Sequence, residues 1–480
     1  MKAQTETIIK YGNLVNGEWI EGSDTFIVEN KYTHEPYAYV AKADAALVDR
    51  AVANAAETFK KVKLEATKRY DILMKAAQLF AKRKEEIALA ICREVGKTIT
   101  DARGEVDRGI QTFIASAEEA KRITGHGMPI HGQQGNEGKM AFSIRVPVGV
   151  VCAITPFNFP FNLTAHKIAP AIAAGNTVVL KPAKNTPISA IKIAEVLLEA
   201  GLPKGYLNVV NGSGSEIGSL LLKDERISMY TFTGSPAVGK TVKSETGIRK
   251  VTLELGNNSP NIIHHDVEDL DRAVELCVSR GYVNSGQACI SVQRIYVHRD
   301  IFDDVLVKAQ KVAQSFVVGN PEDEATNIGP MISIDEAERA EKWVQEAVKM
   351  GARVIAGGTR EGALFQPTVL TDVTEEMKVM CEEVFAPVVS IIPYDDIAEV
   401  FAAANNSKYG LQAGFFTSNL QLAMKAAHEL EFGGVNINDV STFRVDILPY
   451  GGVKDSGLGK EGPRSAVEEM TDEKLITIHI

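Results

Sequence analysis

The chain has 480 residues, of which 45% are apolar and 24% are charged, and its formal net charge is −10. This balance is typical of a globular protein of roughly two to four domains. Lys and Arg are spread along the chain, which argues against nucleic acid as a partner, because phosphate binding needs a concentrated basic face. No run of about 18 apolar residues occurs, so we expect no membrane partner.

Five cysteines lie far apart in the sequence, and their number is odd. They are Cys92, Cys152, Cys277, Cys289 and Cys381. This pattern predicts a reduced, cytoplasmic protein without a disulfide scaffold or a zinc site of the CxxC type. Residues 1–11 lack the apolar core of a signal peptide, so we expect a cytoplasmic location. We also expect no metal site.

The first long elements are expected to be helices, between residues 44 and 124. Apolar side chains of the first helix fall on one face, at Val48, Val52, Ala55, Ala56 and Phe59. A longer apolar stripe from Leu73 to Ile91 predicts a second helix that ends at Gly96.

Short apolar runs follow from about residue 148, each leading into a helical stretch except the last. We expect strands at Val148–Ile154, Thr177–Leu180, Leu207–Val210, Ser228–Phe232 and Val251–Leu255. Continuous Val- and Ile-rich runs suit parallel strands that are buried on both faces. Strands that alternate with helices indicate right-handed βαβ units and a doubly wound sheet.

A second alternation of strands and helices fills the remainder of the chain. Its strands are expected at Asn261–His264, Arg294–Val297, Arg353–Ile355, Val388–Ile392, Ala413–Phe416 and Val435–Ile437. The sequence therefore predicts two α/β domains in series, with a boundary near residue 254. The C-terminal run 474–480 is mostly apolar and predicts a paired strand, either against a partner subunit or at an edge of its own sheet.

Two glycine-bearing turns follow predicted strands. The segment Gly234-Ser-Pro-Ala-Val-Gly239-Lys240-Thr241 fits the Walker A pattern, which leaves a P-loop NTPase open as an alternative. The segment 212–218 is one residue too long for a dinucleotide fingerprint. Such turns expose backbone N–H groups at the positive end of a helix and bind phosphates, so their placement favours a nucleotide cofactor.

Seven short motifs occur in order along the chain. They are Thr155-Pro-Phe-Asn158-Phe-Pro160, Lys181-Pro182, Phe232-Thr-Gly-Ser235, Glu254-Leu-Gly256, Gly286-Gln-Ala-Cys289, Glu382-Glu-Val-Phe-Ala-Pro387 and Pro449-Tyr-Gly-Gly-Val-Lys-Asp-Ser-Gly457. Together they resemble the NAD(P)-dependent aldehyde dehydrogenase superfamily over nearly the whole chain. The resemblance is nearest to the branch that acts on lactaldehyde and, without phosphorylation, on glyceraldehyde 3-phosphate.

The resemblance implies an α/β fold with two doubly wound parallel-sheet domains and a small β oligomerisation extension. Residues 1–122 and 143–253 would form the NAD(P)-binding domain, and residues 254–440 the catalytic domain. Residues 123–142 and 465–480 would supply oligomerisation strands, and residues 441–464 would return to the cofactor domain. A homodimer or homotetramer is the implied assembly.

The resemblance also implies catalytic roles. Cys289 would be the nucleophile, Asn158 the oxyanion donor together with the N–H of Cys289, and Glu254 the general base for deacylation. A free thiol has a pKa of about 8.5, so we expect a helix end and the cationic cofactor to favour the thiolate. Relatives that pass the acyl group to coenzyme A tend to lack this glutamate, so Glu254 favours release of a free carboxylic acid.

Each of these residues taken alone has a plainer structural interpretation. A single Cys in an apolar segment is usually a core residue, and Asn158 alone would be a turn residue. Glu254 would be a solvated strand end, and Lys181 could extend from a strand terminus to water. Their joint occurrence favours the catalytic interpretation over a non-catalytic relative, which should have lost reacting groups.

Cofactor contacts are implied for a further set of positions. Lys181 and Glu383 would hold ribose hydroxyls, Phe385 would lie by the nicotinamide, and Thr155 would line the cofactor site. Ser235 and the turn from Gly234 to Gly239 would contact the diphosphate.

One position bears on the choice between NAD and NADP. Relatives that prefer NAD often carry a glutamate where Lys184 stands, and a cation there is compatible with the 2′-phosphate of NADP. We therefore expect NADP to be accepted. The alternative makes Lys184 a surface residue and leaves NAD usable.

Two residues depart from the family pattern, Ala386 where glycine is usual and Phe157 where Trp is frequent. Neither removes a reacting group. Arg108, Phe159, Ala288 and Arg444 are expected on the substrate side, and guanidinium groups suit carboxylate, phosphate or sulfonate tails. Ala288 stands where phosphate-binding relatives often place arginine, which weakens the phosphate case. An ion pair within its helix is the alternative role of Arg108.

Overall fold

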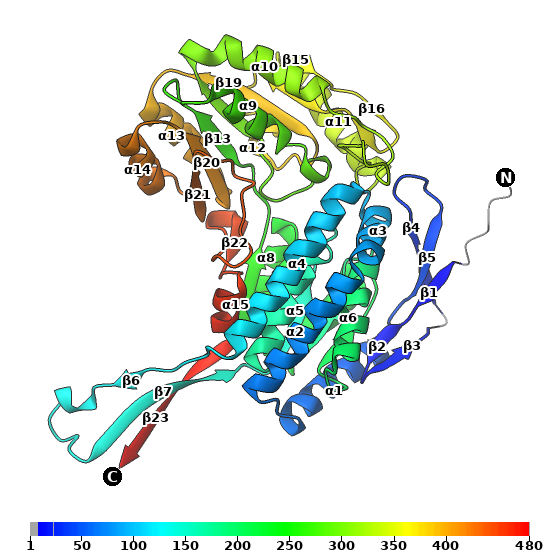
Figure 1. The fold of residues 1–480 in the computed structure, drawn as a ribbon, viewed down its shortest axis with the longest axis vertical. Helices are drawn as coiled ribbons and strands as arrows, with labels where there is room; N and C mark the ends of the chain where they lie inside the picture. The colour runs from blue at the N-terminus through cyan, green and yellow to red at the C-terminus, as the bar shows by residue number, and fades with distance from the viewer. Residues whose placement is uncertain (1–7, 23, 480) are drawn as a thin grey trace.

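The computed structural model describes residues 8–22 and 24–479, and it has an α/β fold. Two large sheets form two lobes, and a narrow β arm projects from one of them (Figure 1). Residues 1–7 of the N-terminal segment and Ile480 of the predicted terminal strand lie outside the described residues. Within the described part, no helix is both long enough and apolar enough to cross a membrane.

The first sheet has the order β22-β12-β11-β8-β9-β10-β2-β3. Its five central strands are parallel and lie where the apolar runs predict them: β8 (Val150–Ile154), β9 (Thr177–Lys181), β10 (Leu207–Val209), β11 (Met229–Thr233) and β12 (Lys250–Glu254). The other three are antiparallel additions that the sequence did not predict: β2 (Asn13–Val15), β3 (Glu18–Ile20) and β22 (Gly457–Leu458).

Both faces of this sheet are covered because alternate residues of each strand point in opposite directions. In β8, Val151 and Ala153 belong to one apolar core, whereas Val150, Cys152 and Ile154 belong to the other. The helices on the first face are α2 (Ala66–Lys82), α3 (Lys84–Val95), α4 (Ile99–Ala120), α5 (Asn162–Ala174) and α6 (Ile188–Ala200). Those on the second are α1 (Ala45–Lys61), α7 (Ser219–Lys223) and α8 (Pro236–Glu245).

The single helix expected over Leu73–Ile91 is wrong, since this segment contains the junction of α2 and α3. The chain leaves the helical conformation at Arg83, where φ is −103° and ψ is 16°. Apolar residues of both helices contact the same core, so the stripe continues across the break. Gly96 ends α3 with a left-handed φ of 86°, as a C-terminal glycine does.

The second sheet has the order β15-β18-β19-β14-β13-β20-β21. Its strands are β13 (Pro260–Ile263), β14 (Arg294–His298), β15 (Arg353–Ala356), β18 (Thr368–Thr371), β19 (Val388–Tyr394), β20 (Gln412–Phe416) and β21 (Gly434–Ile437). All pairs are parallel except β15 with β18, and β18 is a strand that the sequence did not predict. Its helices are α9 (Leu270–Ser279), α10 (Phe302–Gln314), α11 (Ile334–Lys349), α12 (Lys378–Cys381), α13 (Ile397–Asn405) and α14 (Leu420–Glu429).

The arm consists of β6 (Gly127–Met128), β7 (Lys139–Pro147) and β23 (Thr471–His479), which follows α15 (Pro463–Glu469). β23 pairs antiparallel with β7 over its whole length and remains the outer strand of this sheet. Of the two pairings predicted for the C-terminal strand, the one at an edge of its own sheet is therefore present in β23. A smaller sheet near the N-terminus contains β1 (Ile9–Tyr11), β5 (Pro36–Ala41) and β4 (Thr25–Glu29), and β16 (Arg360–Glu361) pairs with β17 (Leu364–Phe365).

Candidate active site

Residues that the sequence singled out gather where the strands of the first sheet end. Asn158 follows β8, Lys181 is the last residue of β9, and Glu254 is the last residue of β12. Because these strands are parallel and adjacent through β11, their carboxyl ends meet at one edge of the sheet.

Cys289 reaches this edge from the second sheet, on a tight loop that precedes β14. Three successive residues of the loop are left-handed, with φ of 53° at Asn284, 57° at Ser285 and 72° at Gly286. A Cβ atom at Gly286 would lie 2.0 Å from the carbonyl oxygen of Ala386, so only glycine fits there. Such conformations cost about 1–3 kcal/mol each and concentrate at functional sites.

Hydrogen bonds hold Asn158 against this loop. Its Nδ2 donates to the carbonyl oxygen of Gln287 at 2.9 Å, and Nδ2 of Asn284 donates to the carbonyl oxygen of Asn158 at 3.1 Å. The amide nitrogen of Asn158 carries two N–H groups, and only this one bond from it occurs within the described part of the chain. A donor of Asn158 therefore remains available beside the loop that carries Cys289.

The thiol of Cys289 contacts a residue that the sequence analysis did not single out. Its Sγ lies 3.1 Å from the hydroxyl of Tyr450. Burial raises the pKa of Cys289 to about 11, although the Tyr450 hydrogen bond and the positive charge of Arg444 lower it. The expected help from a helix end is wrong, because Cys289 follows the C-terminal end of the short 3₁₀ turn Val283–Gly286, which does not favour an anion.

Glu254 is 2% exposed, and neither of its carboxylate oxygens has a hydrogen-bond partner among the described residues. Burial raises the pKa of Glu254 well above its ordinary value, with a further increase from the negative charge of Glu461. The positive charges of Arg444 and Lys167 act in the opposite direction. An unpartnered carboxyl of this kind is suited to a proton-accepting role rather than to a structural one.

A buried charge cluster stands behind these groups. Nζ of Lys167 donates to Glu461 at 2.7 Å, and Nη2 of Arg444 donates to Glu461 at 3.3 Å. Burial opposes ionisation of Glu461, yet Lys167 and Arg444 bring its pKa down to about 2. His166 contacts Asp446 at 2.8 Å in the same cluster, and burial lowers the pKa of His166.

Lys181 and Glu383 fit the hydroxyl groups of a dinucleotide. Lys181 is 4% exposed, its Nζ donates to the carbonyl oxygen of Pro182 at 3.1 Å, and burial lowers its pKa to about 8. The carboxylate of Glu383 accepts from the backbone N–H of Asn257 at 3.0 Å, and burial raises its pKa to about 7. Each buried group makes one contact to the backbone and keeps hydrogen-bonding capacity for a ligand.

Phe385 and Phe157 face each other across this region, with ring centroids 5.9 Å apart and the rings nearly perpendicular. Phe385 has a left-handed φ of 52°, whereas Ala386 is not left-handed. A side chain is therefore tolerated where relatives usually carry glycine. Thr155 is buried, and its backbone N–H donates to the carbonyl oxygen of Lys181 at 3.2 Å, which ties the ends of β8 and β9 together.

The P-loop alternative is wrong. A P-loop needs an extended glycine-rich loop whose N–H groups surround the phosphates, but here α8 begins at Pro236 and includes Gly239 and Lys240. Gly239 serves packing, since a Cβ atom there would lie 2.5 Å from the side chain of Leu255. Lys240 pairs with Asp455 at 2.6 Å. Ser235 caps α8 and leaves its first N–H groups at the same edge as Lys181.

Lys184 lies in the turn after β9. It is exposed, and its Nζ is 5.5 Å from the ring centroid of Phe26. It forms no ion pair with any described residue, so its positive charge is not compensated locally.

The four residues expected on the substrate side share one pocket with Cys289. The pocket has a volume of about 320 Å³, and its lining includes Arg108, Phe159, Ala288 and Arg444. The alternative of an ion pair within the helix of Arg108 is wrong, because the partner of Arg108 is distant in sequence. Nε and Nη2 of Arg108 donate to Asp446 at 2.8 and 3.0 Å.

Arg444 is buried, and its guanidinium lies 3.6 Å from the ring centroid of Tyr450. Its Nη2 contacts His166 and donates to Glu461 in the buried cluster, whereas its Nε is buried without a hydrogen-bond partner among the described residues. A third arginine of the pocket, Arg280, was missed by the sequence analysis. It is exposed, and its side chain makes no ion pair or hydrogen bond with a described residue.

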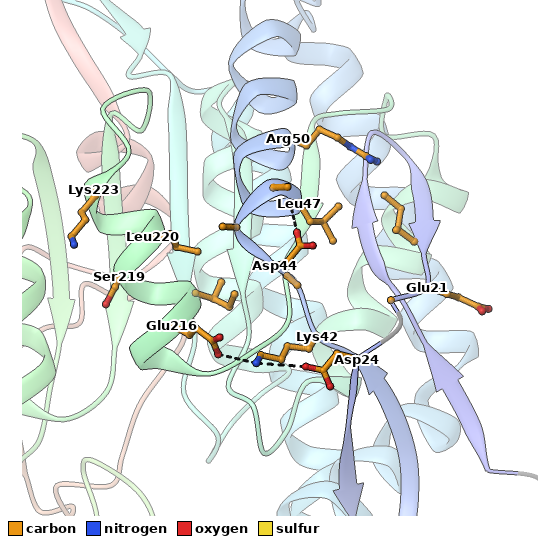
Figure 2. A pocket seen from close by; sticks show the side chains of 16 residues that line it. Glu21, Asp24, Lys42, Asp44, Leu47, Arg50, Glu216, Ser219, Leu220 and Lys223 are labelled. Carbon is orange, nitrogen blue, oxygen red and sulfur yellow. Dashed lines mark hydrogen bonds and ion pairs between the residues drawn. The ribbon is translucent and has the colours of Figure 1, made fainter.

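A larger hollow of about 740 Å³ lies elsewhere, at the start of α1 and beside α7 (Figure 2). Its central cation, Lys42, is paired with Glu216 at 3.1 Å and with Asp24 at 3.6 Å. Size alone therefore does not locate the reactive groups, which meet in the smaller pocket.

Comparisons with known proteins identify the family of the chain. A family model described as "Aldehyde dehydrogenase family" matches residues 19–476. The chain belongs to the aldehyde dehydrogenase family. The resemblance inferred from the seven motifs is thereby confirmed.

Several similar proteins have been named or solved. The 3-sulfolactaldehyde dehydrogenase of Priestia aryabhattai is 53% identical to this aldehyde dehydrogenase over 471 residues, which are 98% of each chain. The crystal structure of aldehyde dehydrogenase 21 from Physcomitrella patens, in complex with the reaction product succinate, matches with a TM-score of 0.96 and 39% identity over 99% of each chain.

A third similar protein is glyceraldehyde-3-phosphate dehydrogenase GapN from Methanocaldococcus jannaschii, complexed with NADP. It matches with a TM-score of 0.92 and 39% identity over 95% of this chain and 100% of that one. This aldehyde dehydrogenase is an NAD(P)-dependent enzyme, with NAD or NADP as its cofactor.

Proposed function

We propose that this aldehyde dehydrogenase oxidises a small aldehyde with an anionic tail to the free carboxylic acid, through a thioester on Cys289. The observation that carries the proposal is the pocket in which the Cys289 thiol lies among the side chains of Arg108, Arg280 and Arg444. Its volume of about 320 Å³ suits a substrate of a few carbon atoms.

Cys289 is the proposed nucleophile. Its Sγ gives up its proton to solvent water, and the Tyr450 hydroxyl and the charge of Arg444 stabilise the thiolate, which then adds to the aldehyde carbon. The resulting oxyanion accepts hydrogen bonds from Nδ2 of Asn158 and from the N–H of Cys289. Donors of this kind contribute about 3 kcal/mol each to the transition state.

An oxidised nicotinamide, when bound, supplies the acceptor for the hydride that leaves the thiohemiacetal carbon. Lys181 and Glu383 would hold ribose hydroxyls, and the helix start at Ser235 would hold the diphosphate. Glu254 then takes a proton from the water that attacks the thioester, and the thiol and a free acid are released. The buried carboxyl of Glu254 supports water rather than coenzyme A as the acyl acceptor.

Arg280 is the proposed anchor of the anionic tail. Asp446 engages Nε and Nη2 of Arg108, and Glu461 engages Nη2 of Arg444, whereas the side chain of Arg280 lines the pocket and forms no ion pair or hydrogen bond with a described residue. The charge of Arg280 also acts on the carboxyl of Asp101. A guanidinium suits a sulfonate or a carboxylate. The similar protein named 3-sulfolactaldehyde dehydrogenase supports a sulfonate-bearing substrate for this chain.

We also infer that NADP is accepted, since Lys184 offers an uncompensated charge to a 2′-phosphate. The similarity to an enzyme solved with NADP supports this inference. A cytoplasmic location is supported by the five free thiols.

We further infer a homodimer or homotetramer in which residues 123–142 and 465–480 form the contact. Exposed apolar side chains on the arm support it, at Met128, Met140, Ile144, Leu475 and Ile478. The division into a cofactor domain (1–122 and 143–253), a catalytic domain (254–440) and a return segment (441–464) stays a proposal alongside it.

The test compares 3-sulfolactaldehyde with lactaldehyde, its neutral analogue, with each cofactor and absorbance of NAD(P)H as the readout. In Arg280→Ala, kcat/KM for the sulfonate should fall at least tenfold relative to lactaldehyde. The control is Arg272→Ala, an exposed arginine outside the pocket in helix α9, which ends just before Arg280, and it should leave the ratio unchanged. An unchanged ratio in Arg280→Ala would overturn the anchor, and turnover in Cys289→Ala would overturn the mechanism.

A further inference from the structure

Three histidines meet at the edge of the second sheet that is remote from Cys289. One ring nitrogen from each of His264, His265 and His298 lies within 4.8 Å of one from each of the others. We propose that these three imidazoles bind a late first-row divalent cation such as Zn²⁺, at a structural site that joins the ends of β13 and β14.

Strand register creates this cluster. Ile263 of β13 pairs with Val297 of the parallel strand β14, so the next residues, His264 and His298, lie side by side. His265 continues the chain from β13 and adds a third ring. The ring centroid of His265 is 4.3 Å from that of His264 and 4.5 Å from that of His298.

The spacing suits a metal with small adjustments. Zn–N bonds of about 2.0–2.1 Å in tetrahedral geometry place ligand nitrogens about 3.3 Å apart. The nitrogens here, within 4.8 Å of one another, need to approach by at most about 1.5 Å, which side-chain rotation can supply. Neutral imidazoles suit Zn²⁺, Cu²⁺ and Ni²⁺, and three of them leave a fourth position for water.

Neighbouring groups contact two of the rings. Nδ1 of His264 lies 2.8 Å from the hydroxyl of Tyr394, which leaves Nε2 of that ring for a metal. Nδ1 of His298 accepts from the backbone N–H of Asp300 at 3.3 Å and lies 3.6 Å from its carboxylate, so metal binding at Nε2 requires Nδ1 to take up the proton and donate to that carboxylate instead.

The carboxylates nearby are otherwise engaged. Asp266 accepts from the hydroxyl of Thr417 at 2.8 and 2.9 Å, and Asp395 pairs with Arg299 at 2.6 Å. The ligand set is therefore nitrogen only, which disfavours Ca²⁺ and Mg²⁺. The sequence predicts no metal site, because the three histidines come together only through the register of β13 and β14.

The site is remote from the reaction. β14 runs from Arg294 to His298, about 13 Å at roughly 3.3 Å per residue, and Cys289 lies before its first residue. A bound metal would thus stabilise the sheet without contacting substrate.

The test uses untagged protein with Cys289→Ser, so that the active-site thiol supplies no ligand. Titration calorimetry with Zn²⁺ and metal analysis after dialysis should give one site per chain, and Zn²⁺ should raise the melting temperature. Adding His265→Ala or His298→Ala should weaken affinity at least tenfold and abolish the thermal shift. The matched control is His428→Ala, an exposed histidine of α14, which should bind as before.

Folding of the variants is checked separately, with His265→Ala in the protein that keeps Cys289. Its NAD(P)H formation should equal that of the unmodified enzyme, since the ring is exposed and far from the pocket. Equal Zn²⁺ affinity with and without His265 and His298, or no binding at micromolar Zn²⁺, would overturn the proposal.

Discussion

Replacement of Glu254 by Gln should change how the free energy of unfolding depends on pH, because the buried carboxyl is exchanged for an amide that does not ionise. In the folded protein, burial and the negative charge of Glu461 raise the pKa of Glu254 well above its ordinary value. In the unfolded chain, a glutamate has a pKa of about 4.3. Between these two pH values the folded protein keeps a proton that the unfolded chain has lost. The free energy of unfolding therefore falls by about 1.4 kcal/mol per pH unit as the pH rises.

Glu254→Gln cannot ionise, so it should lack this decline. Any cost of burying the amide is independent of pH. Above about pH 4.3, the free energy of unfolding of Glu254→Gln should therefore rise relative to that of the unmodified protein by about 1.4 kcal/mol per pH unit. Urea unfolding at a series of pH values measures this slope. The exposed residue Glu473 provides the control Glu473→Gln, which should follow the unmodified protein. Parallel curves for Glu254→Gln and the unmodified protein would refute the reasoning.

Three further replacements have definite expected outcomes. Gly286→Ala places a Cβ atom 2.0 Å from a carbonyl oxygen, at a residue whose φ is 72°. This replacement should lower the free energy of unfolding by more than about 2 kcal/mol. Gly132→Ala is the control, because a Cβ atom there meets open space and should not lower the free energy of unfolding in this way. Tyr450→Phe removes a hydrogen bond that lowers the pKa of Cys289, so alkylation by iodoacetamide should shift to higher pH; an unchanged profile would contradict this. Lys184→Glu should reduce kcat/KM for NADP at least tenfold relative to NAD, and equal losses for both would count against the charge argument.

The parallel strands were predictable because burial on both faces imposes continuous apolar runs, as in β8 and β9. The short strands β2 and β3 carry too few residues for a periodic signal, and the break at Arg83 leaves the apolar stripe in place. β18 reads Thr-Val-Leu-Thr, and its two apolar residues are too short a run to predict a strand.

The candidate site was predictable from its motifs, but the partners of its side chains were not. Arg108 pairs with Asp446, and Cys289 contacts Tyr450, over separations that no local pattern encodes. Tyr450 stands in the Pro-Tyr-Gly-Gly motif, so its signal was present in the sequence. Arg280 carries no motif and is recognisable only from its place in the pocket.

The most direct measurement of the central claim is mass spectrometry of Glu254→Gln after rapid mixing with 3-sulfolactaldehyde and NAD(P)+. If Cys289 forms the thioester and Glu254 activates the water that removes it, one equivalent of NAD(P)H should appear in a burst. The peptide that contains Cys289 should then carry the mass of the acyl group, and further turnover should be slowed about 10²–10⁴-fold. Full steady-state turnover with an unmodified Cys289 peptide would contradict the account.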